Sequence, residues 1–227
     1  MLAGRSAIRL CFVSVFTVLS LSFLVPAEAT SGEVTEQVRT MINSVIDVFN
    51  DKDMKSPEKS SQRNQVLREK ADRIFDWDEM AKRTLGRHWR DITDEQQKQF
   101  IDIFVDFLQR VYLGRIDTFM DQIEGLTYDS VDYLKETKQG RFCMVETVIK
   151  IDNNQFPVNY RLVNKDGKWV VYDVSVEGIG LVANYRTQFN DILNRSTFDE
   201  LIQQLKKRKP EDEKFEGIAV GESARGE

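Results

Sequence analysis

The sequence predicts an α+β fold, in which a helical N-terminal part precedes an antiparallel sheet and a pair of returning helices. Apolar residues recur at helical spacing over residues 33–120, and the apolar period falls to two after Gly125, as is typical of strands. Turn signals at 153–154 and 166–167 predict hairpins between successive strands. We therefore expect a single α+β domain over residues 30–208, with a helical part at about 33–120, a sheet at about 126–177 and closing helices at about 181–207.

The first 29 residues have the pattern of a cleavable signal peptide. Arg5 and Arg9 precede an apolar run over residues 10–25, and the small residues Ala27 and Ala29 follow it. An uncleaved anchor is the alternative, which the run supports weakly because a span of the bilayer needs about 20 apolar residues. We expect cleavage after Ala29 and export of the mature chain.

Two helices are predicted at the start of the mature chain. The first carries an apolar stripe from Val34 to Phe49, and the polar segment 50–61 interrupts the pattern after it. The second helix is predicted over residues 66–75, where apolar residues again share one face.

Capping signals predict the next two helices. Asp76 followed by Glu79 predicts a short third helix that ends near Gly86. Thr93 with Gln96 opens the fourth helix by the same device, and its apolar pattern continues to residue 119.

The fourth helix has an apolar face much wider than that of an ordinary surface helix. Two adjacent rows form it: Phe100, Phe104, Phe107, Leu108 and Val111 in the first, and Ile101, Val105, Leu108, Tyr112 and Ile116 in the second. Two explanations stay open. Either this is a central helix that packs on both sides, or part of its face lines an apolar cavity.

Four strands are predicted next, over 126–134, 141–151, 156–164 and 168–176, with the last three paired as a meander. In the last strand one face is uniformly apolar and the other mixed, which is typical of a sheet covered by helices on one side. Helices at 181–194 and 197–207 follow. Residues 209–227 lack an apolar period, and we expect them to be a disordered tail.

Composition argues against a nucleic-acid-binding protein. The 227 residues contain 37 acidic and 32 basic ones, a formal net charge of −5, so no basic footprint is available to neutralise phosphates. The basic run at 206–209 complements the dipole of the helix that it closes, and attraction to an anionic membrane surface is the alternative.

The sequence contains few candidates for catalysis. Cys143 is alone once Cys11 leaves with the signal peptide, and we expect it to be a buried apolar residue. His88 is the one histidine, and it more simply fixes a loop than acts as a base. Motifs for a serine nucleophile, a P-loop or a dinucleotide are absent. The carboxylates Glu146, Asp173 and Glu177, on or beside predicted strands, keep a cavity enzyme open as an alternative.

Two stretches resemble one known family. Residues 75–90 (FDWDEMAKRTLGRHWR), with 93–97 and 112–115 after them, are similar to the helical half of the MlaC proteins, also called toluene-tolerance proteins. Residues 167–189 (GKWVVYDVSVEGIGLVANYRTQF) resemble the same family's signature from the last strand into the next helix. With the order of elements, the similarity covers roughly residues 33–207. One departure is Gly180, where the family pattern leads us to expect a serine, and this puts a polar headgroup contact there in doubt.

The resemblance implies a periplasmic phospholipid carrier of the maintenance-of-lipid-asymmetry pathway. It implies helices joined to a curved sheet related to the nuclear-transport-factor-like fold, with a deep apolar pocket that takes acyl chains and leaves the headgroup at its mouth. The implied partners are an outer-membrane lipoprotein complex and the substrate-binding ring of an inner-membrane ABC transporter. It also implies no catalytic residue, metal or nucleotide, so phospholipid is bound as cargo and not as a cofactor. We expect a monomer that contacts membrane proteins transiently.

With this resemblance, two walls of the pocket can be predicted. The apolar face of the fourth helix forms one wall, and the apolar side of the sheet forms the other. The candidate lining residues are Phe104, Leu108, Tyr112 and Ile116 on the helix and Val158, Tyr160, Tyr172, Val174 and Ile179 on the sheet. Arg161 and Arg186 are candidates for weak phosphate contact.

Three hypotheses stay open: a lipid carrier, an isomerase or hydrolase that uses a cavity on the same sheet, and a periplasmic interaction module with a solid core. A hopanoid or related lipid is a variant of the first hypothesis.

Overall fold

The fold is that of a computed structural model, which describes residues 32–123 and 125–209. These residues fall within one compact unit. The predicted signal peptide (1–29) and, apart from Lys209, the predicted tail (209–227) lie outside the described residues. No helix in this described part of the chain is long and apolar enough to cross a membrane.

The first helices lie close to their predicted positions. They are α1 (Glu33–Asn50), α2 (Ser60–Ile74) and α3 (Trp77–Leu85), with the 3-10 turns η1 (Pro57–Lys59) and η2 (Gly86–Arg90) before α2 and after α3. Asp76 Oδ1 accepts a hydrogen bond from the Glu79 backbone N–H at 3.2 Å. Gly86 ends α3 with a φ of 56°, a conformation that glycine adopts without steric cost. The predicted start and stop of the third helix are therefore confirmed.

The fourth helix begins as predicted but ends earlier. At the start of α4 (Asp94–Leu113), Gln96 N–H donates to Thr93 Oγ1 and Thr93 N–H donates to Gln96 Oε1. The prediction of one helix up to residue 119 is wrong, because the chain leaves the helix around Gly114 and starts α5 (Ile116–Ile123). Glycine favours helix poorly, and the Arg115 N–H bonds to the Tyr112 carbonyl in a tightened turn.

One antiparallel sheet contains five strands in sequence order: β1 (Val131–Gln139), β2 (Phe142–Ile151), β3 (Asn154–Lys165), β4 (Lys168–Val176) and β5 (Ile179–Gly180). The predicted meander is confirmed, but only four strands were predicted, and β5 was not among them. This strand forms because Glu177 and Gly178 both have positive φ, which makes a tight turn and places Ile179 opposite Val176.

The first strand was predicted too early in the chain. It was expected over 126–134, whereas residues 128–130 form the 3-10 turn η3 (Tyr128–Ser130) and β1 begins at Val131. β1 is an edge strand, and residues 137–139 are all exposed. Because this half of the strand has no apolar face, its sequence lacks the alternation on which the prediction depended.

A β-bulge in β4 changes which of its residues share a face. Leu162 pairs with Val171 but the preceding Arg161 pairs with Asp173, so Tyr172 is the extra residue. The predicted alternation through this strand is therefore wrong, since a shift of one residue moves every later side chain to the other face. Trp169, Val171 and Val174 share one face, whereas Tyr172 packs edge-to-face on Phe142 on the other.

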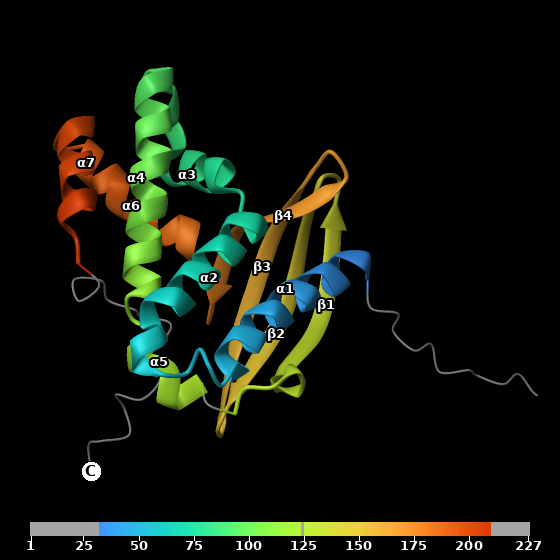
Figure 1. Ribbon diagram of the computed structural model, residues 1–227. Helices are drawn as coiled ribbons and strands as arrows, with labels where there is room; N and C mark the ends of the chain where they lie inside the picture. Colours follow the sequence, from blue (N-terminus) through green and yellow to red (C-terminus); the bar gives the residue numbers. More distant parts are fainter. Residues whose placement is uncertain (1–31, 124, 210–227) are drawn as a thin grey trace, which may run out of the picture. The chain divides into compact units, whose positions relative to one another are not determined.

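The closing helices α6 (Leu181–Leu193) and α7 (Phe198–Lys207) pack with α4 into a helical core (Figure 1). Aromatic rings dominate this core: Phe104 meets Tyr185 and Phe189 edge-to-face, at centroid distances of 5.9 and 5.8 Å. The wide apolar face of α4 is thus explained over most of its length by packing between helices. Its buried residues are Phe100, Phe104, Phe107, Leu108 and Val111.

A second apolar core lies between α1 and the sheet. Val34 and Val38 of α1 pack on one face of the strands, which Figure 1 shows crossed by this helix. The sheet residues of this core are Cys143, Val145, Leu162, Trp169 and Val171. We call this side of the sheet the inner face, and the side that carries Phe142 and Tyr172 the outer face.

Candidate functional site

The candidate site is the part of the inner face beyond the second core, where apolar side chains are only partly covered. Tyr160 lies opposite Val174 on β4 and opposite Val145 on β2, and Val158 lies one pleat further along β3. Val158 is buried, whereas Tyr160 and Val174 are half-buried and pack against the second core. Three of the five predicted sheet residues therefore lie side by side on this face.

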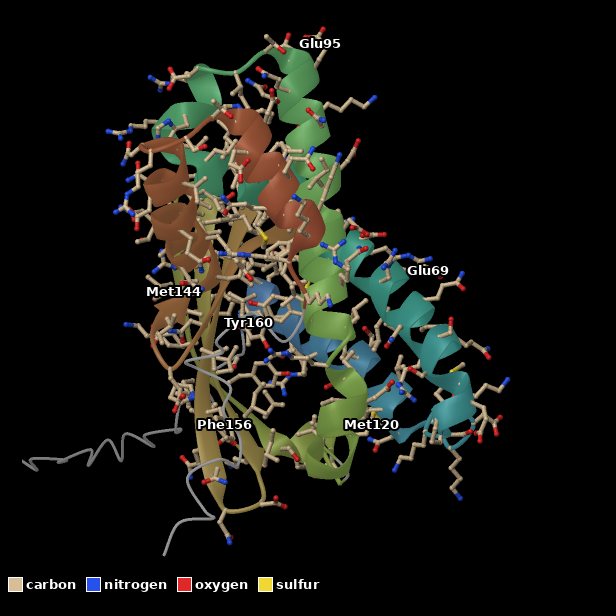
Figure 2. All side chains as sticks on the ribbon, turned by 90° about the vertical axis from the view of Figure 1, so that its left-hand side faces the viewer. Glu69, Glu95, Met120, Met144, Phe156 and Tyr160 are labelled. Carbon is tan, nitrogen blue, oxygen red and sulfur yellow. The ribbon has the colours of Figure 1, made fainter. Side chains whose placement is uncertain are left out.

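Tyr160 is surrounded by protein but keeps accessible surface. Burial raises the pKa of its hydroxyl, with a further contribution from Tyr133, although the side chain is only half-buried. Figure 2 places Phe156 of the strand layer and Met120 of α5 at one end of the molecule, with Tyr160 nearer its middle. Neighbouring residues therefore shield Tyr160 without burying it completely.

Tyr133 of β1 adds a polar group to the same face. Its register partner on β2 is Thr147, next to Val158 on β3. The Arg39 guanidinium of α1 lies 3.9 Å from the centre of the Tyr133 ring. The hydroxyl oxygen of Tyr133 is buried and has no hydrogen-bond partner within the described part of the chain. A buried donor without an acceptor is costly, so this hydroxyl is a point where a ligand oxygen could be bound.

Two of the predicted sheet residues lie outside this group of three. The bulge places Tyr172 on the outer face, where the Arg83 guanidinium of α3 lies 4.2 Å from its ring centre. Ile179 is in β5, and 45% of its surface is exposed. The prediction that all five sheet residues form one wall is therefore wrong for Tyr172. Ile179 is opposite Val176 and so on the same face as Val158, but at an exposed end of the sheet.

The four predicted helix residues are also divided. Phe104 and Leu108 are buried within the helical core. Tyr112 is half-buried at the end of α4 and packs against the same core. Ile116 begins α5 and is half-buried. Of these four side chains, only those of Tyr112 and Ile116 keep accessible surface. The break at Gly114 lies between these two residues and interrupts the predicted row.

The residues considered for catalysis do not form a site together. Asp173 accepts a hydrogen bond from the Val182 N–H at 2.9 Å at the start of α6. Glu177 is exposed in the turn before β5, and Glu146 lies on the outer face, opposite Asn159. His88 Nε2 lies 3.2 Å from Asn190 Oδ1, which ties η2 to α6 as predicted for a loop-fixing role.

Cys143 is the buried apolar residue that was predicted. It lies in the second core, and burial raises the pKa of its thiol to about 11. Residues 32–209, as far as they are described, contain no group of three or more His, Cys, Asp or Glu side chains that could hold a metal ion.

The family-model comparison decides the relationship. A model described as "MlaC protein" matches residues 39–207. The chain belongs to the MlaC family. This agrees with the resemblance seen in residues 75–90 and 167–189, both of which lie within the matched range.

Curated relatives of this MlaC-family chain have related names. The intermembrane phospholipid transport system binding protein MlaC of Haemophilus influenzae is 23% identical over 127 residues, which cover 54% of this chain and 57% of the relative. The toluene tolerance protein ttg2D of Pseudomonas putida is 28% identical over 128 residues, which cover 56% of this chain and 57% of the relative. The chain thus spans somewhat over half the length of the curated relatives that it matches.

A solved structure shares the fold. The phospholipid-binding protein from Ralstonia solanacearum, solved in complex with a phospholipid, matches with a TM-score of 0.63 and 24% identity. The match covers 75% of this chain and 93% of that one. At this level of identity the comparison shows the α+β fold.

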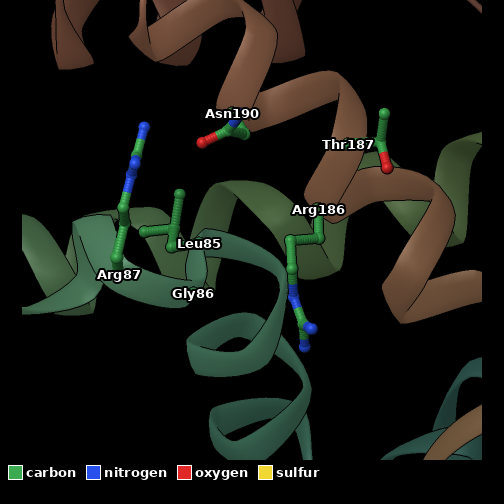
Figure 3. Close-up of a pocket in the computed structure, with 6 residues that line it drawn as sticks. All are labelled: Leu85, Gly86, Arg87, Arg186, Thr187 and Asn190. Atoms are coloured by element: carbon green, nitrogen blue, oxygen red, sulfur yellow. The ribbon is translucent and has the colours of Figure 1, made fainter.

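The two arginines considered for phosphate contact lie apart from the inner face. Arg161 is exposed on β3 at an outer-face position, opposite Asp173. Arg186 of α6 lines a hollow of about 370 Å³ between η2 and α6 (Figure 3). Neither this hollow nor Tyr133 was predicted from the sequence, which carries no local signal for either.

Proposed function

We propose that this MlaC-family chain is a periplasmic carrier that binds the acyl chains of a phospholipid at its inner face. The observation that carries the proposal is Tyr160, a half-buried aromatic side chain that lies opposite Val174 among the partly covered apolar residues of the inner face. We infer an interior space beside it, bordered by Val158 and Val174 of the sheet. The names of the relatives and the bound phospholipid of the Ralstonia protein support the same class of cargo.

An apolar inner face is what such cargo requires. Each CH₂ group left in water costs about 0.8 kcal/mol, and a diacyl lipid has roughly thirty of them. A carrier must therefore cover most of both chains with apolar side chains. We propose that Tyr112 and Ile116 border the space from the helical side, with the unpartnered hydroxyl of Tyr133 facing a lipid ester or phosphate oxygen.

The remaining parts of the proposal rest on the sequence pattern and on the resemblance to the family. The carrier is exported by a signal peptide cleaved after Ala29 and shuttles lipid between an outer-membrane lipoprotein complex and the substrate-binding ring of an inner-membrane ABC transporter. It folds as a single domain over residues 30–208 around a curved, nuclear-transport-factor-like sheet, and it acts as a monomer without a cofactor. It is not an enzyme, and this agrees with the use of Asp173 as a helix cap.

Two valines of β4 give a matched test of the site. Val174 and Val170 are both half-buried, and they lie on the inner and outer faces respectively. We expect Val174→Glu to lose the phospholipid that copurifies with the protein, because a carboxylate in the lipid space is costly to bury. Val170→Glu should keep it. Organic extraction followed by mass spectrometry measures the lipid in each protein.

Thermal unfolding of both variants is the control for folding. Charged substitutions at Tyr112 or Val158, the predicted lining residues, should behave like Val174→Glu while the protein stays folded. If folded Val174→Glu keeps as much phospholipid as Val170→Glu, the inner face is not the lipid site.

A further inference from the structure

Two tyrosine side chains bring hydroxyl groups to the candidate site at the inner face. Tyr133 lies on β1 and Tyr160 on β3, and both rings pack at the border of the second core. Tyr133 is paired with Thr147 of β2, and Tyr160 is paired with Val145, the next residue of β2 on the same face. Because alternate residues of a strand share a face, the two tyrosines lie diagonally across β2 on one side of the sheet.

The two phenol groups are near enough to influence each other. Burial is the main cause that raises the pKa of the Tyr160 hydroxyl, and the neighbouring Tyr133 adds to it. Burial also raises the pKa of Tyr133. Both hydroxyls therefore stay protonated at neutral pH, where each can donate one hydrogen bond.

Neither of these donors is satisfied by the protein. The Tyr133 oxygen is buried without a hydrogen-bond partner, and the Tyr160 hydroxyl forms no hydrogen bond within residues 32–123 and 125–209. The hydroxyl of Thr147 beside them differs, because it donates to the Val158 carbonyl at 2.8 Å. The inner face thus holds two hydrogen-bond donors that lack an acceptor.

The cation that contacts Tyr133 is already paired. The Arg39 guanidinium lies 3.9 Å from the centre of the Tyr133 ring, and its Nε donates to Glu36 Oε1 at 3.3 Å. A phosphate carries a full negative charge, which is costly to bury without a cation of its own. A neutral acceptor therefore suits the two neutral donors better than a phosphate oxygen does.

We propose that the hydroxyls of Tyr133 and Tyr160 donate hydrogen bonds to the ester carbonyls of the bound lipid, so that the carrier favours acyl esters over ether-linked chains. This inference rests on the carrier function proposed above and names the part of the lipid that its polar groups recognise.

The order of groups along a phospholipid supports this assignment. In a diacyl lipid the ester carbonyls are the first polar groups beyond the acyl chains, so they reach the border of an apolar site that holds those chains. A carbonyl taken out of water without a donor costs free energy, and an unpaired buried hydroxyl does so as well. One hydrogen bond between them removes both costs. An ether-linked lipid has a CH₂ group in place of each carbonyl and leaves the hydroxyls unpaired.

The test is a competition between two lipids that differ in these carbonyls alone. Delipidated protein is incubated with vesicles that contain equal amounts of dipalmitoyl phosphatidylcholine and its dihexadecyl ether analogue, which have the same headgroup and chain length. The lipid on the reisolated protein is extracted and quantified by mass spectrometry. We expect the ester lipid to be enriched about fivefold over the ether lipid, the change in binding that one neutral hydrogen bond provides.

Variants assign this preference to the two hydroxyls. The Tyr133→Phe, Tyr160→Phe double variant keeps both rings, so it should still load lipid but in the ratio present in the vesicles. Each single variant should give an intermediate ratio. Tyr172→Phe is the matched control, because it removes a tyrosine hydroxyl from the outer face of the same sheet, and it should keep the full enrichment. Thermal unfolding checks that every variant is folded.

Three results would overturn the proposal: equal loading of the two lipids by the unchanged protein, the same enrichment in the double variant, or an equal loss of enrichment in Tyr172→Phe. A folded double variant that loads less of both lipids in an unchanged ratio would also overturn it and assign the hydroxyls to the phosphate that both lipids share. If the unchanged protein loads neither lipid, the carrier function fails too, whereas equal loading contradicts only the recognition of the ester.

Discussion

At the scale of single residues, Tyr133 is the clearest sign of a ligand that needs a polar partner. Its hydroxyl is buried without a hydrogen bond in the described part of the chain, and burial raises its pKa. We expect Tyr133→Phe to stabilise the lipid-free protein by about 1 kcal/mol, since an unsatisfied buried group is removed. Urea unfolding of delipidated protein measures this. A loss of stability would show that the hydroxyl has a partner already.

Asp173 shows how a residue that suggests catalysis can serve structure. It accepts the Val182 N–H at the start of α6, and burial raises its pKa, against the effect of that bond and of nearby arginines. A raised pKa means that the folded state favours the protonated carboxyl. The contribution of Asp173 to stability is thus full below its ordinary value of 3.8 and is lost as pH rises through the folded pKa.

A pair of variants tests this role of Asp173. Asp173→Asn should remove the loss of stability with rising pH and keep an acceptor for Val182. Asp173→Ala leaves that N–H without a partner and should cost about 1 kcal/mol at neutral pH. Thermal unfolding across a pH series compares them. Equal pH dependence in Asp173→Asn and the unchanged protein would contradict the assignment.

Gly180, the departure from the expected family pattern, lies beside the carboxylate that caps α6. It precedes α6 and provides no side-chain cap, and Asp173 from the neighbouring strand supplies the acceptor instead. A Cβ at Gly180 would lie 3.4 Å from Asp173 Oδ2, so a serine would have to share this space with the carboxylate.

At the scale of elements, α1 and α6 share one device. Neither has a capping side chain of its own, and a carboxylate from the sheet accepts hydrogen bonds at each start. For α1 this is Glu136 of β1, whose Oε2 accepts both the backbone N–H and the hydroxyl of Thr35 at 2.8 Å. A Cβ at Gly32 would collide with the same carboxylate, which accounts for the glycine there. Hydrogen bonds to these two carboxylates thus join the starts of α1 and α6 to the sheet.

The Glu136 cap has the opposite pH dependence from Asp173. Burial opposes ionisation, but the hydrogen bonds from Thr35 and the nearby Lys138 outweigh it and lower the pKa of Glu136. Its stabilisation is present above the ordinary value of 4.5 and is lost as pH falls through the folded pKa. Glu136→Gln should cost about 1 kcal/mol at neutral pH and flatten the acid limb of the stability profile. A stability curve of unchanged shape would contradict this.

Elements with local signals were predictable from the sequence, and those set by distant contacts were not. The helix caps at Asp76 and Thr93 and the turn at Asp166 depend on residues within a few positions of each other, and the structure confirms them. The bulge at Tyr172 depends on pairing with β3, and β1 is an edge strand without an apolar repeat. Such features follow from tertiary pairing, which a single-strand pattern does not encode.

At the scale of the whole molecule, the two apolar cores divide the predicted site. Phe104 and Leu108 belong to the core between helices, whereas Tyr160 and Val174 border the core between α1 and the sheet. Composition and periodicity predicted that the lining residues are apolar, but not which of the two cores each residue belongs to. Only contacts between distant segments separate side chains that fill a core from those that border a space.

The central claim is that phospholipid acyl chains occupy the space at the inner face. Native mass spectrometry of the purified protein tests it most directly. The account predicts folded ions heavier than the polypeptide by the mass of at least one phospholipid, which collisional activation releases and lipid analysis identifies. Folded ions at the mass of the polypeptide alone, or with a polar metabolite bound in place of a lipid, would contradict it.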